Sequence, residues 1–264
     1  MTGIRIKSPA MRLVLFLGAI AFISACALTL EDERRLGVES SQKIAREKRI
    51  VQDPVVVGYL REMGNRLAAA AGPQPFPFTF NVVVDPGINA FAGPAGFVYV
   101  NTGLLMKARS SAEVAGVLSH EISHVTLRHI SQSVARQQQA GGIGSIVSTI
   151  TNEPALGSIA GTGVSIYNLR FDRQAEAQAD RSGLRLMHRA GYDPRGMISM
   201  FELLQSQGSG GRGGFLSSHP GTPQRIGAMR AEIAKLPPGR GGVLRDGKLA
   251  GVQARIRSWG TGAP

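Results

Sequence analysis

Residues 117–129 read VLSHEISHVTLRH, with two histidines four residues apart and a glutamate directly after the first. Ser110 and Glu113 form an S-x-x-E capping pattern ahead of apolar residues at helical spacing, so the stretch predicts a helix. On one face of that helix, His120 and His124 lie one turn apart. Their Cβ atoms are about 5 to 6 Å from each other, close enough for both rings to share one ion.

The glutamate between the histidines suggests hydrolytic chemistry. Glu121 is rotated by about 100° from His120, so it can address a metal-bound water without being a ligand. Neutral imidazoles suit zinc, and zinc lowers the pKa of its bound water to about 7. Glu121 would accept the water's proton and pass it to the leaving amine. We therefore expect one Zn2+ per chain; the alternative is a helix with two surface histidines.

A third ligand must come from another segment. Leu127 and Ile130 stand where the longer HExxHxxGxxH pattern has a glycine and a histidine. His129 lies off the ligand face, and we expect it to be structural. The later stretch DRQAEAQAD predicts a helix with Glu176 and Asp180 one turn apart. A carboxylate ligand followed by a carboxylate that orients a ligand histidine fits this spacing; the alternative is a solvated acidic face.

The remaining pattern indicates an α+β fold that is mainly helical. LEDERRLGVESSQKIAREKRI and DPVVVGYLREMGNRLAAAAG predict two amphipathic helices between residues 30 and 71. FTFNVVVD (78–85) and GFVYVNTG (96–103) have the β-branched and aromatic content of strands. The turn-rich segment PGINAFAGPAG connects them. We therefore expect helices around a small sheet.

Five motifs together resemble the M48 family of zinc metallopeptidases. They are YLREMGNRLAAAAG, NAFAGPAGFVYVNTGLL, EVAGVLSHEISHVTLRH, EAQAD and HPGTPQRI, in this order between residues 30 and 236. The resemblance implies a gluzincin-like peptidase domain with an edge strand beside the HExxH helix. It implies that zinc is held by His120, His124 and Glu176, with Glu121 as general base and acid. It also implies that substrate backbone lies along GFVYV as an edge strand. This strand comprises Gly96, Phe97, Val98, Tyr99 and Val100.

The HP motif contributes two further residues through the same resemblance. His219 is expected near the metal, where it stabilises the oxyanion or caps the zinc in a resting state. Arg225 is expected to orient His219 or to bind substrate carbonyls. Read without the resemblance, the motif is a turn with a surface histidine. The chain departs from the family's patterns at Gln178, where E-x-E-A-D has its second acid, and at Ala95, where P-G-G has its first glycine.

The N-terminal segment predicts export. Basic residues precede the apolar run LVLFLGAIAFI (13–23), which is too short to span a bilayer and is typical of a secretory signal. The following ISACA contains Cys26, the only cysteine, and resembles a bacterial lipobox in which that cysteine is lipidated. Ala27 then suggests the outer membrane by resemblance to lipoprotein sorting rules. The alternative is an ordinary signal peptide with an incidental cysteine.

We expect four regions. Residues 1–25 are a lipoprotein signal peptide, 26–48 a tether and first helix region, 49–236 the peptidase domain, and 237–264 a basic Gly/Pro-rich tail that is only partly ordered. The apolar small-residue segment 140–167 is expected to form a helical hairpin or lid, because Asn-Glu-Pro interrupts it and disfavours a membrane span.

These features predict a zinc-dependent endopeptidase on the periplasmic face of a Gram-negative membrane. Its expected substrates are misfolded or stalled envelope and outer-membrane proteins. The expected partners are the membrane, through a lipid anchor, and the outer-membrane assembly machinery. The alternative is a chaperone-like or scaffolding lipoprotein on the same fold with little proteolysis. The net charge of +12 alone does not choose a partner, and export argues against nucleic acid.

Overall fold

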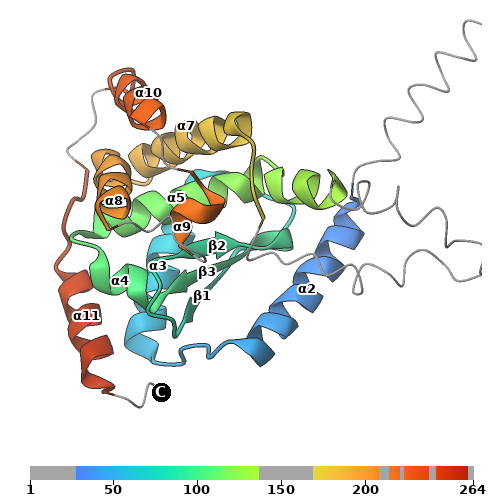
Figure 1. Cartoon of the computed structure of the whole chain (residues 1–264), viewed down its shortest axis with the longest axis horizontal. Coiled ribbons are helices and arrows are strands. Elements are labelled where there is room, and N and C mark those ends of the chain that lie inside the picture. The colour runs from blue at the N-terminus through green and yellow to red at the C-terminus, as the bar shows by residue number, and fades with distance from the viewer. Residues whose placement is uncertain (1–27, 137–168, 208–213, 221–222, 238–241, 261–264) are drawn as a thin grey trace, which may run out of the picture.

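The computed structural model describes residues 28–136, 169–207, 214–220, 223–237 and 242–260. Cys26, the predicted signal segment and the predicted hairpin at 140–167 lie outside them. The helices are α2 (Leu30–Glu47), α3 (Pro54–Ala70), α4 (Thr102–Lys107), α5 (Ser111–Thr126), α7 (Arg173–Arg189), α8 (Arg195–Ser206), α9 (Phe215–Ser218), α10 (Pro223–Ile233) and α11 (Lys248–Ser258). The strands are β1 (Thr79–Val83), β2 (Ala90–Ala92) and β3 (Phe97–Asn101). The predicted class, α+β and mainly helical, is confirmed (Figure 1).

Side-chain caps explain where the predicted helices begin. The Thr29 hydroxyl accepts the first-turn N–H of Asp32 in α2, and the Asp53 carboxylate accepts two N–H groups of α3. Ser110 caps α5 by accepting the N–H of Glu113 at 3.2 Å. Each cap pairs a backbone donor that has no partner inside its own helix. The predicted starts of these three helices are confirmed.

The sheet has the strand order β1-β3-β2, which corrects one prediction. β3 pairs with β1 in parallel and with β2 antiparallel, so Phe97 to Val100 lie in the central strand and Gly96 directly precedes it. Both of its edges are occupied, and it cannot receive a substrate strand. The prediction for Gly96 to Val100 is therefore wrong, because the preceding NAFA segment forms β2 instead of a turn. The edge strand that packs against α5 is β2.

Helix α5 lies at the centre of the fold, between the sheet and α7 (Figure 1). Residues 111–124 are all buried, so this helix has no solvent face until its last turn. Two glycines allow the neighbouring helices to approach. A Cβ added at Gly116 would lie 2.6 Å from Met197 Cα of α8, and one at Gly183 of α7 would lie 3.2 Å from His120 N. This close approach brings α7 against the HExxH motif.

The C-terminal segment contains a helix that was not predicted. α11 packs against α3 and α4, where Gln253 Nε2 donates to the carbonyls of Leu105 at 2.9 Å and Ala108 at 2.8 Å. Arg255 Nε donates to Asp53 Oδ2 at 2.6 Å. The segment that was expected to be partly ordered therefore contains one ordered helix. The Gly-rich, basic composition of the segment does not indicate a helix, because the contacts that hold α11 come from residues far away in the sequence.

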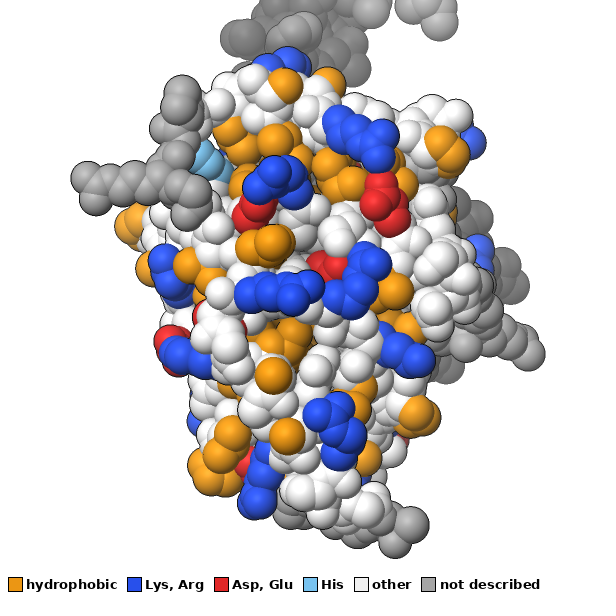
Figure 2. Space-filling model, turned by 90° about the vertical axis from the view of Figure 1, so that its left-hand side faces the viewer, with side chains coloured by type: hydrophobic (Ala, Val, Ile, Leu, Met, Phe, Trp, Pro, Cys, Tyr) orange, Lys and Arg blue, Asp and Glu red, His pale blue; other side chains and the backbone are white. Residues whose placement is uncertain are grey.

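Basic side chains are spread over the face that includes α11. Figure 2 shows lysine and arginine side chains separated by apolar and other groups, without one continuous basic groove on this face. Several carry acidic partners, such as Lys248 with Glu62 and Arg230 with Glu202. Among the described helices, none combines the length and the apolar character needed to cross a bilayer.

The close approach of α5 and α8 predicts a contrast between two glycines. Gly116→Ala should lower the free energy of unfolding by about 1–3 kcal/mol, because the added methyl group overlaps Met197 backbone. Gly58→Ala, in the exposed part of α3 with no atom within 4 Å of the new Cβ, should raise it by up to about 1 kcal/mol. Urea unfolding of both variants measures this contrast, and equal values would contradict the described packing.

Candidate active site

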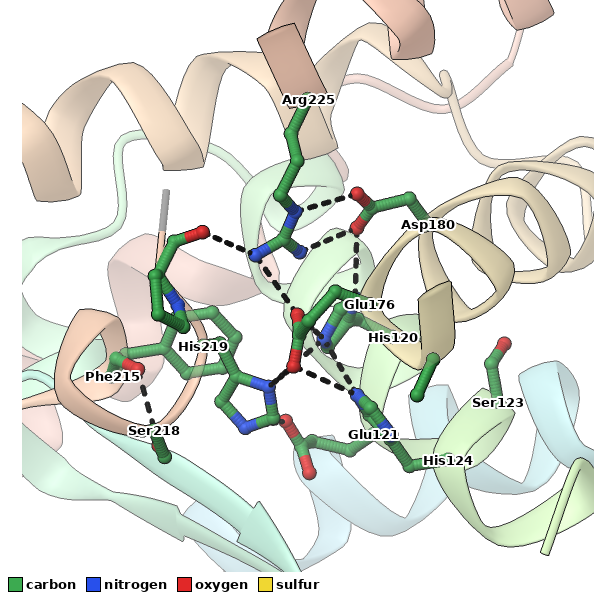
Figure 3. Close-up of polar contacts among 12 residues, drawn as sticks. His120, Glu121, Ser123, His124, Glu176, Asp180, Phe215, Ser218, His219 and Arg225 are labelled. Atoms are coloured by element: carbon green, nitrogen blue, oxygen red, sulfur yellow. Dashed lines mark hydrogen bonds and ion pairs between the residues drawn. The ribbon is translucent and has the colours of Figure 1, made fainter. Parts of the chain in front are cut away.

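Four buried side chains from three parts of the chain converge at one point (Figure 3). His120 and His124 extend from α5, Glu176 from α7, and His219 from the residue that follows α9. One potential ligand atom from each side chain lies within 4.8 Å of all the others. The structure thus brings together the three residues that the resemblance implied as ligands, with His219 as a fourth.

Several separations between these side chains are close to those of ligands on one metal ion. His120 Nε2 lies 3.0 Å from His124 Nε2, 3.4 Å from Glu176 Oε2 and 3.2 Å from His219 Nδ1. Glu176 Oε1 lies 3.6 Å from His124 Nε2 and 2.9 Å from His219 Nδ1. Ligands bound tetrahedrally to zinc at about 2.0–2.1 Å are about 3.3 Å from one another. The donor set, three imidazoles and a carboxylate, is also one that zinc accepts.

The buried charges point to a divalent cation as well. Glu121, Glu176 and Asp180 are each at most 3% exposed, and one guanidinium, that of Arg225, binds two of these carboxylates. Buried carboxylates are costly unless a positive charge pairs with them. Arg225 alone does not pair with all three carboxylates, so a cation at the convergence point would be stabilised there.

The pKa of His120 reflects the same imbalance. Burial disfavours its charged form, but Asp180 and Glu176 outweigh burial and raise the pKa of His120 to about 9. The cluster therefore favours a positive charge beside His120, which a proton or a metal ion can supply. Burial and the neighbouring His120 instead hold the pKa of His124 well below its ordinary value, so that ring is neutral.

The two glutamates of the cluster differ in their acidity. Burial alone would raise the pKa of Glu176, but His219 and His120 beside it hold that pKa far below its usual range. Burial raises the pKa of Glu121, although His219 and His120 partly oppose this shift. Glu176 is thus fixed as a carboxylate, while Glu121 holds a proton more readily. This difference separates a ligand from a proton acceptor.

Asp180 and Arg225 support the cluster from outside. Asp180 Oδ1 lies 3.0 Å from His120 Nδ1, on the far side of the ring from the convergence point. Arg225 donates to both oxygens of Asp180 at 2.7 and 2.8 Å, and its Nη1 lies 2.9 Å from Glu176 Oε2. Its Nη1 also donates to the carbonyl of Pro220, next to His219. Arg225 therefore clamps carboxylates, rather than lying open for the substrate carbonyls that were one of its expected partners.

The side of β2 that does not pair with β3 is buried and faces Glu121. Asn89 and Gly93 direct their backbone groups toward β3, where Asn89 O accepts from Asn101 N and Gly93 N donates to Phe97 O. Because backbone groups alternate along an antiparallel strand, Ala90 and Ala92 direct theirs away from β3. The N–H of Ala92 hydrogen-bonds to Glu121.

Aromatic rings around the histidines were not predicted. Phe171 stacks on His124 with ring centroids 3.9 Å apart, and Phe215 stacks on His219 at 4.6 Å. Phe201 lies edge-on to His120 at 6.0 Å. These phenylalanines belong to three separate segments, so no spacing in the sequence links them to the motif. They exclude water from the outer faces of the imidazoles.

A second contact of the motif helix was also missed. His129, expected to be structural, is buried with its Nδ1 3.1 Å from His124 Nδ1. Its Nε2 lies 2.9 Å from Oε1 of Gln178, one of the positions where the chain departs from the family pattern. Two features of the sequence could have indicated this contact: the histidine that lies outside the ligand face, and the amide side chain within EAQAD.

A helix-borne HExxH motif, with a buried glutamate from a second helix at its histidines, defines a gluzincin-like metallopeptidase. The model of peptidase family M48 matches residues 54–233. The chain belongs to this family of metallopeptidases, as its motifs predicted.

Curated relatives are longer proteins. The chain is 32% identical to a beta-barrel assembly-enhancing protease of Yersinia pestis, over 70% of this chain and 40% of the relative. It is 29% identical to the beta-barrel assembly-enhancing protease of Escherichia coli K12, over 80% of this chain and 46% of the relative. It is 30% identical to the mitochondrial metalloendopeptidase OMA1 of Arabidopsis thaliana, over 70% and 38%. The chain spans less than half the length of each of these relatives.

Proposed function

We propose that the protein is a zinc-dependent endopeptidase whose metal is held by His120, His124 and Glu176. The observation that carries this proposal is the convergence of these side chains with His219 inside a buried cluster. When bound, zinc lowers the pKa of a coordinated water to about 7 and polarises the scissile carbonyl. Asp180 keeps a proton on His120 Nδ1, so Nε2 presents its lone pair to the site.

Glu121 moves the proton in this mechanism. Its carboxylate takes a proton from the attacking water and delivers it to the leaving nitrogen. Burial raises the pKa of Glu121, which brings it closer to the pKa of the water from which the carboxylate must accept a proton. The phenylalanines beside the histidines keep bulk water from competing for this proton.

The substrate strand in this proposal is β2 in place of β3. Ala90 and Ala92 are buried in this state and the N–H of Ala92 is bound to Glu121, so an extended peptide would pair along this side of β2 only after α9 moves aside. The contact between Ala92 and Glu121 places such a peptide beside the proton acceptor. Backbone pairing binds chains of many sequences, which fits unfolded proteins as substrates.

The Glu121→Gln variant tests the proposed mechanism. It should retain one zinc per chain, because Glu121 is not a ligand, and lose casein cleavage by at least about 100-fold, because a general base is removed. Metal analysis and a casein assay on the purified full chain measure the two quantities, with Glu202→Gln on the exposed part of α8 as the control. Equal cleavage by Glu121→Gln and wild type would contradict the mechanism. The cleavage would then come from a contaminating protease, and the chain would be a binding protein.

His219 is proposed to cap the metal in a resting state. Its Nδ1 lies at hydrogen-bond distance from both His120 Nε2 and Glu176 Oε1, where it completes a set of four ligands. A closed set of four leaves no open position for water. The short helix α9 holds this residue, and Phe215 N of that helix donates to Ile88 O at 3.2 Å, next to the edge of β2. A peptide that pairs along β2 would therefore meet α9 and release His219.

His219→Ala distinguishes the cap from an oxyanion-stabilising role. A cap predicts weaker zinc binding and faster cleavage of an unstructured peptide, because an open coordination position appears. Zinc affinity and the initial rate of peptide cleavage measure this, with Ser217→Ala on the same short helix as the control. Slower cleavage with unchanged zinc affinity would contradict the cap and support oxyanion stabilisation by His219.

The cell envelope of a Gram-negative bacterium is the proposed location. Relatives in Yersinia pestis and Escherichia coli carry the name beta-barrel assembly-enhancing protease, which supports envelope proteins as the substrate class. We propose misfolded or stalled outer-membrane proteins as the substrates and the outer-membrane assembly machinery as a partner. The four sequence regions, with the peptidase domain at 49–236, belong to this proposal.

Lipidation of Cys26 is the proposed anchor. The lipobox-like ISACA after an apolar run supports it. Fractionation of cells that produce Cys26→Ser should move the protein from the membrane to the soluble fraction. Unchanged membrane retention would contradict the anchor and leave the peptidase proposal intact.

A further inference from the structure

The two motif histidines have different partners on their outer nitrogens. His120 Nδ1 faces the carboxylate of Asp180 at 3.0 Å, whereas His124 Nδ1 faces another imidazole, His129 Nδ1, at 3.1 Å. Both partners are at most 3% exposed. The inner nitrogens of both motif histidines, Nε2, point into the cluster and lie 3.0 Å apart. One histidine is therefore supported by an anion and the other by a ring.

The hydrogen bonds around His129 run in one direction. Its Nε2 lies 2.9 Å from Gln178 Oε1, and a side-chain amide oxygen only accepts, so the proton of the neutral ring is on Nε2. His129 Nδ1 then carries a lone pair and accepts from His124 Nδ1–H. The same proton on His124 leaves its Nε2 with a lone pair directed at the other ligand atoms. Gln178 thus favours, through the ring of His129, the tautomer of His124 that leaves Nε2 able to bind a metal.

We propose that His129 and Gln178 are positioning residues for His124, an inference that rests on the proposed metal site. Neither residue touches the convergence point itself. Their part is to hold the tautomer and the ring orientation of His124, as a partner on the outer nitrogen does for a metal-ligating histidine. Because both groups are uncharged, they do so without adding a fourth carboxylate to the buried cluster.

The backbone at Arg128 is what brings His129 to this place. α5 ends at Thr126, Arg128 adopts the left-handed conformation with φ of 58°, and residues 129–136 are helical again. This conformation is unfavourable for a non-glycine residue, and contacts of the Arg128 side chain can offset its cost. Arg128 Nη2 lies 2.6 Å from the buried carboxylate of Glu33 in α2 and donates to Leu28 O at 3.3 Å. This turn returns His129 toward the preceding turn of α5.

Zinc affinity of His129 variants tests the proposal, measured by competition with a chelating indicator on the full chain. His129→Leu should bind zinc about 10–100-fold more weakly, the usual effect of losing such a partner. His129→Asn should stay close to wild type, because its Oδ1 keeps an acceptor near the position of Nδ1. His188→Asn, at the far end of α7, is the matched control and should not change the affinity.

A second measurement separates positioning from packing. Thermal unfolding with zinc removed measures the contribution of His129 to packing. If His129 positions His124, the zinc affinity of His129→Asn should stay close to that of wild type even where its melting temperature is lower. Gln178→Leu, which keeps the histidine, should also weaken zinc binding and serves if His129→Leu does not fold. Tight zinc binding by wild type with equal affinity in all variants would overturn this inference alone. Failure of wild type to bind zinc would overturn the proposed function as well.

Discussion

The carboxylates of Glu121, Glu176 and Asp180 are buried at the HExxH motif, and the surrounding elements are arranged to supply partners for them. Burial of unpaired charge is costly, so each carboxylate requires a partner that other elements must deliver. α10 supplies the guanidinium of Arg225, which joins Asp180 to Glu176. His219, which directly follows α9, supplies an imidazole beside Glu176. The divalent ion proposed for the site would add positive charge, and the glycines of α5 and α7 permit the approach that makes the cluster compact.

The supports of the two motif histidines connect the site to different parts of the fold. His120 is tied through Asp180 and Arg225 to α7 and α10. His124 is tied through His129 to the turn at Arg128, and from there to Glu33 of α2. Helices α7 and α10 therefore determine the charge beside His120. Helix α2 contributes, through Glu33, to the position of His124.

Local geometry decided what the sequence could predict. The capped HExxH helix and the one-turn spacing of Glu176 and Asp180 follow from the helix repeat, and the structure has both features. Strand order depends on non-local pairing, so the three-residue β2 within a turn-rich segment was missed and β3 was misplaced at the edge. His129 would lie about 140° around an unbroken helix from His124. Only the left-handed turn at Arg128 brings the rings together.

X-ray absorption at the zinc edge of the purified chain is the decisive test of the proposed ligand set, because it reports which atoms surround the ion. We expect one zinc per chain with four nitrogen or oxygen neighbours at about 2.0–2.1 Å, and outer-shell scattering from imidazole rings. A shell of six oxygens without imidazole scattering would contradict it, as would a chain that holds no zinc when the ion is supplied.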